Sequence, residues 1–231
     1  MTAESAVIPA QAGIQKQRVA LLGAESTGKT TLAFALAEYL RGRGFDAVAV
    51  PETLRAWSAR EGRAPGAEEQ LAIAHEHEGR VDAACARHDI VIADTTALKV
   101  AIHAGMLCAE DALHRFAMAQ QGRYDATLVT GLDVAWTPDG LQREAASREH
   151  VDTLLREHLQ RAGVAYDVVY GQGPQRLRSA VQALMARGVL PQATREPGEG
   201  AGAASWVWSC DKCSDPACEH RLFTKLKDDR G

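Results

Sequence analysis

A phosphate-binding loop is the clearest chemical pattern in this chain of 231 residues. An apolar run ends at Gly23, four residues follow, and Gly28-Lys29-Thr30 then opens a helix-like segment. Glycines at this spacing let the backbone close on an anion with its amide groups pointing inward. We predict that one continuous stretch binds the nucleotide, namely Gly23, Ala24, Glu25, Ser26, Thr27, Gly28, Lys29, Thr30 and Thr31.

Two side chains of this stretch have distinct chemistry. The Lys29 ammonium would neutralise the β- and γ-phosphates as a catalytic group, and the Thr30 hydroxyl would bind Mg²⁺. The N-terminus of the following helix adds a partial positive charge. These features predict ATP and Mg²⁺ as the ligands of the loop.

Two acidic side chains, Glu52 and Asp94, directly follow strand-like segments. Ligands of α/β sheets bind at the carboxyl ends of strands, so both carboxylates should face one crevice. We interpret Asp94 as a catalytic residue that orients Mg²⁺ or its water shell, with an acidic helix cap as the alternative. Glu52 could accept the proton of a substrate hydroxyl, hold a sugar hydroxyl, or only complement a helix dipole.

Four further side chains are candidates for substrate binding beside Glu52. Arg55, one turn later, could pair with Glu52 or hold a substrate phosphate. Trp57 could stack on a ring or pack in the core. His75 and Glu78 are three residues apart on a predicted helix and would share a face toward the crevice.

Two arginines, Arg143 and Arg148, follow a Pro-Asp-Gly turn in a segment of mixed charge. This composition predicts a mobile loop, and mobile arginines beside such a loop can move onto the phosphates and exclude water. Both are therefore catalytic candidates, with a charged helix face as the alternative. Lys99, in contrast, is interpreted as a solvated charge on the helix that Thr95 and Thr96 open.

The elements that position these residues alternate between strand and helix. Hydrophobic patterns and flanking turns predict strands over residues 17–22, 47–50, 88–94, 124–130 and 165–170. They predict helices over residues 29–41, 67–87, 111–121 and 174–187. The alternation favours an α/β fold of the P-loop NTPase kind, a three-layer sandwich around a five-stranded, mainly parallel sheet.

Composition and charge exclude several classes of protein. The net charge of −4 argues against a general nucleic-acid binder. No apolar run approaches the roughly 20 residues that span a bilayer, and the first residues lack the pattern of a secretory signal. We therefore expect a cytoplasmic protein whose partner is a small-molecule phosphate acceptor. Its segments are a disordered lead, a P-loop kinase-like domain, a flexible linker rich in Pro, Gly and Ala, and a Cys-rich tail, over residues 1–16, 17–189, 190–205 and 206–231.

The tail holds three of the five cysteines. With one histidine they form a set of four ligands that suits tetrahedral Zn²⁺: Cys210, Cys213, Cys218 and His220. A structural zinc ion would let this segment fold without a core, and an unstructured tail or a redox pair are the alternatives. The tail is also a candidate contact for a protein partner. Cys85 and Cys108 are interpreted as buried, inert thiols.

Four motifs follow one another along residues 17–187: Gly23-Ala-Glu-Ser-Thr-Gly-Lys-Thr30, Glu52 to Arg55, Asp94, and Trp136-Thr-Pro-Asp-Gly-Leu-Gln-Arg143. In this order they resemble the ribosylnicotinamide kinase domain of the NadR-type NAD regulators. The resemblance implies a P-loop kinase fold and a part in NAD biosynthesis, by transfer of the γ-phosphate of ATP to a ribose hydroxyl of nicotinamide riboside. It would assign Lys29 and Thr30 to ATP·Mg²⁺, Asp94 to the metal or the acceptor hydroxyl, Glu52 and Arg55 to the substrate, and Arg143 to a lid.

Two positions depart from that family's pattern. Glu52-Thr53-Leu54-Arg55 stands where the family has Glu-Tyr-Gly-Arg, and Asp94-Thr95-Thr96 stands where it has Asp-Thr-Asp. The identity of the acceptor therefore stays open. The first hypothesis is an ATP-dependent kinase of a small nucleoside-like molecule. The second is an ATP-binding regulatory switch whose Cys-rich tail contacts a partner.

Overall fold

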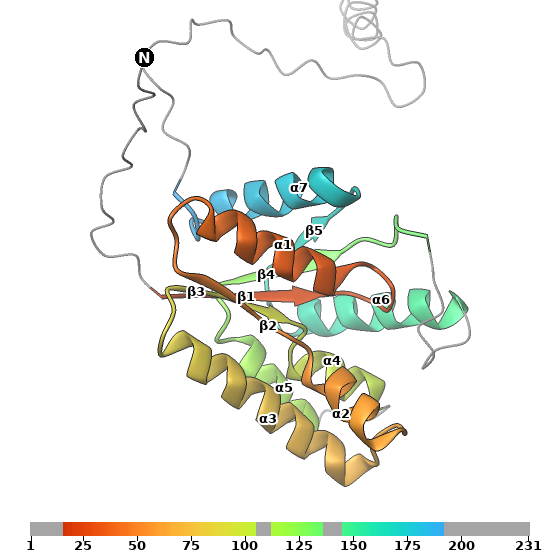
Figure 1. Cartoon of the computed structure of the whole chain (residues 1–231). Coiled ribbons are helices and arrows are strands. Elements are labelled where there is room, and N and C mark those ends of the chain that lie inside the picture. Colours follow the sequence, from red (N-terminus) through yellow and green to blue (C-terminus); the bar gives the residue numbers. More distant parts are fainter. Residues whose placement is uncertain (1–15, 105–111, 136–144, 192–231) are drawn as a thin grey trace, which may run out of the picture. The chain divides into compact units, whose positions relative to one another are not determined.

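The computed structural model describes residues 16–104, 112–135 and 145–191. The chain divides into two units, residues 1–192 and 193–231, and all the described residues belong to the first. Strands and helices alternate along it (Figure 1). The strands are β1 (Gln17–Leu22), β2 (Ala47–Val50), β3 (Ile90–Asp94), β4 (Ala126–Thr130) and β5 (Asp167–Val169). The helices are α1 (Lys29–Arg41), α2 (Thr53–Glu61), α3 (Ala67–Cys85), α4 (Ala97–His103), α5 (Ala112–Gln121), α6 (Ala145–Arg161) and α7 (Gly173–Ala186).

The five strands form one sheet in the order β2-β3-β1-β4-β5, and every neighbouring pair is parallel. The predicted α/β fold is thereby confirmed. Because β1 is central, its carboxyl end lies between those of β3 and β4. Leu21 pairs with Asp94 on one side, and Leu22 pairs with Val129 on the other. The loop after β1 therefore emerges between Asp94 and the end of β4.

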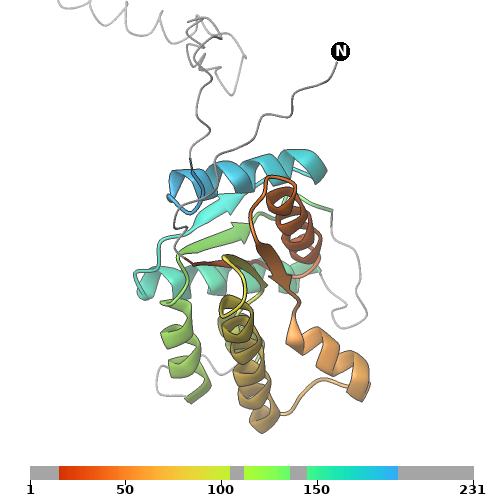
Figure 2. The same cartoon turned by 60° about the vertical axis from the view of Figure 1, so that its left-hand side comes forward.

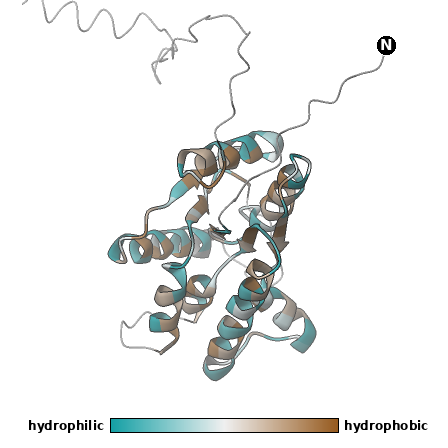
Figure 3. Cartoon of the chain, turned by 90° about the vertical axis from the view of Figure 1, so that its left-hand side faces the viewer, coloured by the Kyte–Doolittle hydropathy of each residue, from teal (hydrophilic) through white to brown (hydrophobic). Residues whose placement is uncertain are grey.

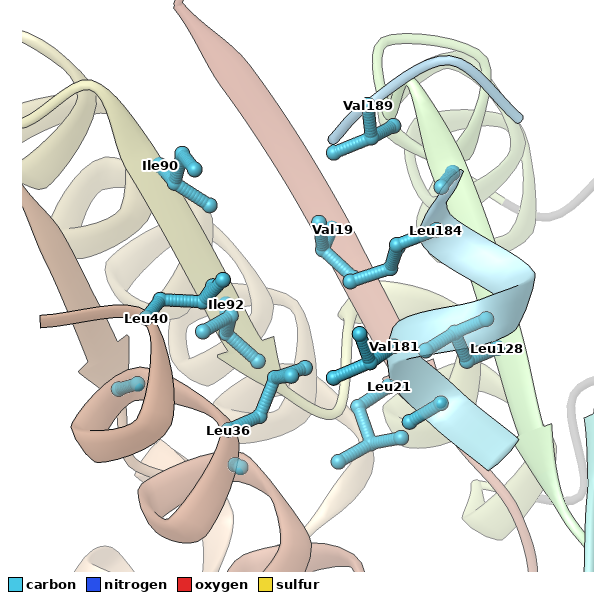
Figure 4. Close-up of a cluster of buried hydrophobic side chains, with 14 of the residues drawn as sticks. Val19, Leu21, Leu36, Leu40, Ile90, Ile92, Leu128, Val181, Leu184 and Val189 are labelled. Carbon is cyan, nitrogen blue, oxygen red and sulfur yellow. The ribbon is translucent and has the colours of Figure 1, made fainter. Parts of the chain in front are cut away.

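Helices cover both faces of the sheet (Figures 1 and 2). Helices α1 and α7 pack on one face, where Leu36 and Leu184 approach Leu21 and Leu128 (Figure 4). Helices α4, α5 and α6 bury their apolar side chains with Leu22 and other residues on the opposite face. Helix α3 packs beside them against β2 and β3. The sheet is thus the middle layer of three.

The central strands are hydrophobic because both their faces are covered. All five residues of β3 and all five of β4 are buried, which is typical of parallel strands. Figure 3 shows the hydropathy of each residue along the chain. Cys85 at the end of α3 is buried, as expected. No helix in the described part of the chain is long and apolar enough to cross a membrane.

Candidate functional site

The phosphate-binding loop is the turn between β1 and α1. Gly23 and Gly28 have φ values of +143° and +77°, which L side chains rarely adopt. A Cβ atom on Gly23 would lie 2.1 Å from Oγ1 of Thr130, at the end of β4. Oγ1 of Thr27 donates to the Ala24 carbonyl at 2.7 Å and lies 2.7 Å from Oγ1 of Thr130. These contacts hold the loop closed against the carboxyl end of β4.

Lys29 is the first residue of α1, and its side chain is buried. Its Nζ donates a hydrogen bond of 2.5 Å to the carbonyl of Ala24 in the loop. The pKa of Lys29 is lowered to about 7, chiefly by burial and next by the positive charge of Lys99. A phosphate in the loop would supply the negative charge that favours this buried ammonium.

Thr30 and Asp94 meet below the loop. Oγ1 of Thr30 donates to Oδ2 of Asp94 at 2.5 Å, because β1 and β3 are neighbours in the sheet. Burial raises the pKa of Asp94, and the charge of Glu52 acts in the same direction. Oδ1 of Asp94 is buried and has no hydrogen-bond partner among the described residues. An unpaired carboxylate oxygen beside a hydroxyl fits Mg²⁺, which prefers oxygen ligands and is usually shared with phosphates.

A pocket of about 200 Å³ adjoins the loop, between it and helices α2, α3 and α4. Its charged and polar lining comes from Glu25, Glu52, Arg55, Ser58, Gln70, Lys99 and His103. Its apolar lining comes from Leu54, Ala64, Pro65 and Val100. The loop that would hold the phosphates therefore forms part of the wall of this pocket.

Glu52 lies at the start of α2 with 8% of its side chain exposed. Its Oε1 is 3.3 Å from Nζ of Lys99, and its Oε2 is 3.5 Å from Nε of Arg55. Burial favours protonation of Glu52, but Lys99, Lys29 and Arg55 outweigh burial and lower its pKa. The pocket wall thus carries an ionised carboxylate.

The expectation that Lys99 is a solvated charge is wrong. Only 5% of the residue is exposed, because six consecutive residues of α4, Ala97–Ile102, are buried in the fold. Its Nζ is 3.5 Å from Oε1 of Glu25 and also contacts Glu52. His103, one turn along α4, places Nε2 2.6 Å from the same oxygen of Glu25. Two features of the sequence could have indicated this: a carboxylate inside the loop, which needs partners when it is buried, and a lysine and a histidine four positions apart on one helix.

From the sequence, Arg176 on α7 was also not identified as a residue of the site. It is 4% exposed, and its Nη1 donates to the carbonyl of Thr27 in the loop. Its Nη2 donates to Oδ1 of Asp133 at 2.5 Å, and Oδ2 of Asp133 accepts from the amide of Gly171 at 2.6 Å. The arginine ties the loop to the segments that follow β4 and β5. An acid and an arginine that follow neighbouring strands could have indicated this contact.

His75 and Glu78 make contacts between helices. We predicted from the sequence that they would face the crevice. The ring of exposed His75 lies 3.8 Å from that of Phe116, centroid to centroid. The carboxylate of Glu78 accepts from the amide of Ala97 at 2.9 Å and from the hydroxyl of Tyr124 at 3.0 Å. Glu78 therefore satisfies an amide at the start of α4, and neither residue lines the pocket.

The three residues that depart from the family pattern, Thr53, Leu54 and Thr96, differ from one another in whether they face the pocket. Oγ1 of Thr53 lies 3.1 Å from Nδ1 of the buried His77. Oγ1 of Thr96 donates to Oε1 of Gln121 at 2.8 Å and caps α4. Both threonines are buried and hydrogen-bonded within the fold, whereas Leu54 lines the pocket.

The remaining candidates lie apart from the pocket or outside the described residues. Trp57 is 9% exposed, and the guanidinium of Arg63 lies 4.9 Å from the centroid of its ring. Arg148 on α6 is buried, and its Nε and Nη2 have no hydrogen-bond partner in the described part of the chain. Arg143 lies outside the described residues.

The predicted zinc ligands also lie outside the described residues, as does Cys108: they are Cys210, Cys213, Cys218 and His220. Within residues 16–104, 112–135 and 145–191, no group of three or more His, Cys, Asp or Glu side chains could hold a metal ion. The zinc site stays a prediction.

A family model described as an AAA domain matches residues 18–176. No curated protein matches the chain. Among solved structures, a NadR protein in complex with NR is similar with a TM-score of 0.58 and 20% identity, over 76% of this chain and 52% of that chain. A NadR protein in complex with NAD and AMP-PNP has a TM-score of 0.57 and 18% identity, over 78% of this chain and 52% of that one. Thymidylate kinase from Ehrlichia chaffeensis has a TM-score of 0.50 and 16% identity, over 74% of this chain and 98% of that one.

The chain thus spans about half the length of the NadR chains that it matches. These identities are low, so the likeness shows the fold. It is the fold of P-loop kinases, and the predicted resemblance to the NadR-type domain is confirmed at that level.

Proposed function

We propose that this chain, which belongs to the AAA domain family, is an ATP-dependent phosphotransferase acting on a hydroxyl group of a small nucleoside-like acceptor. The kinase fold of its structural neighbours and the pocket beside the loop support this function. Nicotinamide riboside, which the NadR-type motifs suggest, is the first acceptor to test.

The observation that carries the proposal is the shared wall of the pocket. Glu25 belongs to the phosphate-binding loop and Glu52 follows β2, and both line the same cavity. A molecule in the cavity would lie between the loop and a carboxylate. Transfer to a bound acceptor needs this arrangement, whereas hydrolysis by water needs no such cavity.

The donor side would hold ATP with loop amides and the side chain of Lys29. Thr30 and Asp94 would hold Mg²⁺, since Oδ1 of Asp94 is available beside the threonine hydroxyl. When bound, Mg²⁺ would neutralise charge on the phosphates. The protein's part is to place the γ-phosphate in line with the acceptor.

On the acceptor side, Glu52 would accept the proton of the acceptor hydroxyl. The hydroxyl oxygen forms a bond to the γ-phosphorus, the bond from that phosphorus to the bridging oxygen breaks, and ADP leaves. Lys99, Lys29 and Arg55 favour this chemistry because they keep Glu52 ionised before the transfer.

The test is ADP release by the full chain with ATP and Mg²⁺, with and without an acceptor. The acceptors are nicotinamide riboside, nucleosides, sugars and thiamine-like alcohols, and the phosphorylated product is identified by mass spectrometry. We expect one acceptor to raise ADP release and to gain one phosphate. Equal ADP release with and without every acceptor would favour the regulatory ATPase with the Cys-rich tail as its partner contact.

Glu52→Gln is the matched variant, because it keeps the size of the side chain and removes the proton acceptor. We expect kcat to fall by about 10²- to 10⁴-fold. Glu61→Gln, on the same helix but paired at the surface with Arg60, should keep the wild-type kcat. An unchanged rate in Glu52→Gln would exclude the assigned role of this carboxylate.

A further inference from the structure

Lys99 is a buried lysine near the start of α4, and it forms or breaks no bond in the proposed chemistry. Its amide donates to the carbonyl of Thr96, so the residue lies in the first helical turn. A positive charge in the first turn is unfavourable, because the helix N-terminus already has a partial positive charge. Buried charges persist in proteins when they are paired. The position of Lys99 therefore depends on its partners.

Those partners are two carboxylates from separate segments. Nζ of Lys99 lies 3.5 Å from Oε1 of Glu25 in the loop and 3.3 Å from Oε1 of Glu52 before α2. All three side chains are at most 8% exposed, so solvent screens the interactions little. Burial disfavours the charge of Lys99, but Glu52 and Glu25 outweigh burial and raise its pKa.

Glu25 is itself held by α4 at a second point. Nε2 of His103 lies 2.6 Å from its Oε1, four residues after Lys99 and thus on the same face of the helix. Burial favours protonation of Glu25, but His103 and Lys99 lower its pKa to about 2. A side chain of the phosphate-binding loop is therefore fixed against the pocket by two groups of one helix.

We infer that Lys99 is a positioning residue for phosphoryl transfer: it ties Glu52 to the phosphate-binding loop through Glu25. The inference rests on the proposed function, in which Glu52 receives the acceptor proton. The lysine sets the separation between that carboxylate and the loop, and thus the distance between acceptor and γ-phosphate. It acts through Glu52 and does not itself bond to the reacting atoms.

The charges that face Glu52 come from several elements. Lys99 of α4, Lys29 of α1 and Arg55 of α2 favour its ionised form. The charge of Glu52 in turn raises the pKa of Asp94 at the end of β3. Lys99 has the largest effect among the cations. An opposite charge within about 4–6 Å lowers the pKa of a carboxylate by about 1–3 units. Loss of Lys99 should therefore raise the pKa of Glu52.

The experiment measures kcat/KM for the acceptor against pH at saturating ATP and Mg²⁺, using the acceptor found in the screen. The variants are Lys99→Met and Lys99→Arg. In Lys99→Met the acidic limb of the kcat/KM profile should move to higher pH by about 1 unit or more, because the pKa of Glu52 rises. In Lys99→Arg the limb should return toward that of the wild type, because the charge is restored. Arg161→Met removes an exposed cation on α6 that pairs with Glu157, and its limb should match the wild type.

A second variant keeps the inference testable if Lys99→Met fails to fold. In Glu25→Gln, Glu52 is the one carboxylate of the pair that still contacts Lys99. The acidic limb of the kcat/KM profile of this variant should therefore move to lower pH. Shifts in opposite directions for the two variants are not expected from a general loss of stability. If either folded variant has the wild-type limb, the inference is wrong. If the wild type transfers no phosphate to any acceptor, the proposed function fails instead.

Discussion

The phosphate side of the crevice is one continuous segment, whereas the pocket side takes its side chains from several separate segments. Residues 23–30 supply the loop, and two glycines give it its conformation. The pocket draws Glu25 from the loop, Glu52 from the start of α2, Gln70 from α3 and Lys99 from α4. On the first side, backbone amide groups of the loop would bind the phosphates. On the second side, charged side chains line the pocket.

This difference predicts how the two sides respond to mutation. A backbone cradle fails when its conformation is disturbed, because its amide groups then point away from the phosphates. A network of charged side chains responds gradually, since one lost charge changes the pKa of its neighbours. Variants of the loop should therefore abolish nucleotide binding or transfer, and variants of the pocket should shift pH dependence or acceptor preference.

The largest effect is expected for Lys29→Met. Loss of the ammonium from the phosphates should lower kcat by on the order of 10³-fold. The nucleotide-free variant should unfold at the wild-type temperature or above, because burial lowers the pKa of Lys29 and thus opposes its charge. Steady-state kinetics and thermal unfolding measure the two outcomes. Transfer at the wild-type rate would remove Lys29 from the mechanism.

The sequence was sufficient to predict where the loop lies between strand and helix, although it did not reveal the contact of Arg176 with the loop. A loop of this kind needs glycine at defined spacings, so its geometry is visible in consecutive residues. The strand-ending acids were also predictable, because parallel strands place their carboxyl ends at one edge. Asp94 lies 2.5 Å from Thr30 as a consequence of the pairing of β1 with β3.

The pocket side could not be predicted in the same way. Periodicity shows which residues share a helix face, but not which element covers that face. His75 and Glu78 were therefore assigned to the crevice, although α3 uses them against Phe116 and the start of α4. Lys99 was assigned to solvent for the same reason. Its burial depends on the packing of α4 against α3, α5 and α6.

The second-largest effect of a mutation is expected for Gly23→Ala. The new Cβ would lie 2.1 Å from Oγ1 of Thr130, at a φ of +143°. Strain and overlap together should lower the free energy of unfolding by about 2–4 kcal/mol and weaken ATP binding. The matched control is Gly44→Ala, where φ is +85° but a Cβ would meet nothing within 4 Å. Chemical unfolding should give the control a loss of about 1 kcal/mol, from backbone strain alone.

Equal losses in the two alanine variants would show that Thr130 can yield to the added carbon. The statement that the loop cannot adapt to a mutation, whereas the pocket can, would then be wrong for the loop. Calorimetric ATP binding separates the two positions further. Gly44 follows α1, away from the loop, so Gly44→Ala should bind ATP as the wild type does.

The smallest effect tests whether the two sides are independent. The pKa of Lys29 is about 7 in the nucleotide-free protein, so the ammonium is about one-tenth populated at pH 8. Bound phosphates favour the charged form, and ATP binding at pH 8 should take up about 0.9 proton. Near pH 6 the uptake by this residue should fall to about 0.1 proton, because Lys29 is already mostly charged. Calorimetric titration in buffers of different ionisation enthalpy measures the number.

The same pKa determines the sign of a stability effect in the nucleotide-free protein. Lys29 in the unfolded chain keeps its proton up to about pH 10.4, whereas the folded chain releases it near pH 7. The unfolded state binds more protons between these values, so this residue's contribution makes the free energy of unfolding rise with pH. Below pH 7 both states are charged, and the cost of burying the ammonium is fully present.

Lys99 links this proton to the pocket, because its charge is the largest contribution after burial to the low pKa of Lys29. In Lys99→Met the pKa of Lys29 should rise, and proton uptake on ATP binding at pH 8 should fall below that of the wild type. Arg161→Met, with its lost charge on the surface of α6, should keep the wild-type uptake. Unchanged uptake in Lys99→Met would mean that the phosphate side titrates independently of the pocket. A reduced uptake would show that a lysine of the acceptor wall helps to set the charge of the lysine that contacts the donor.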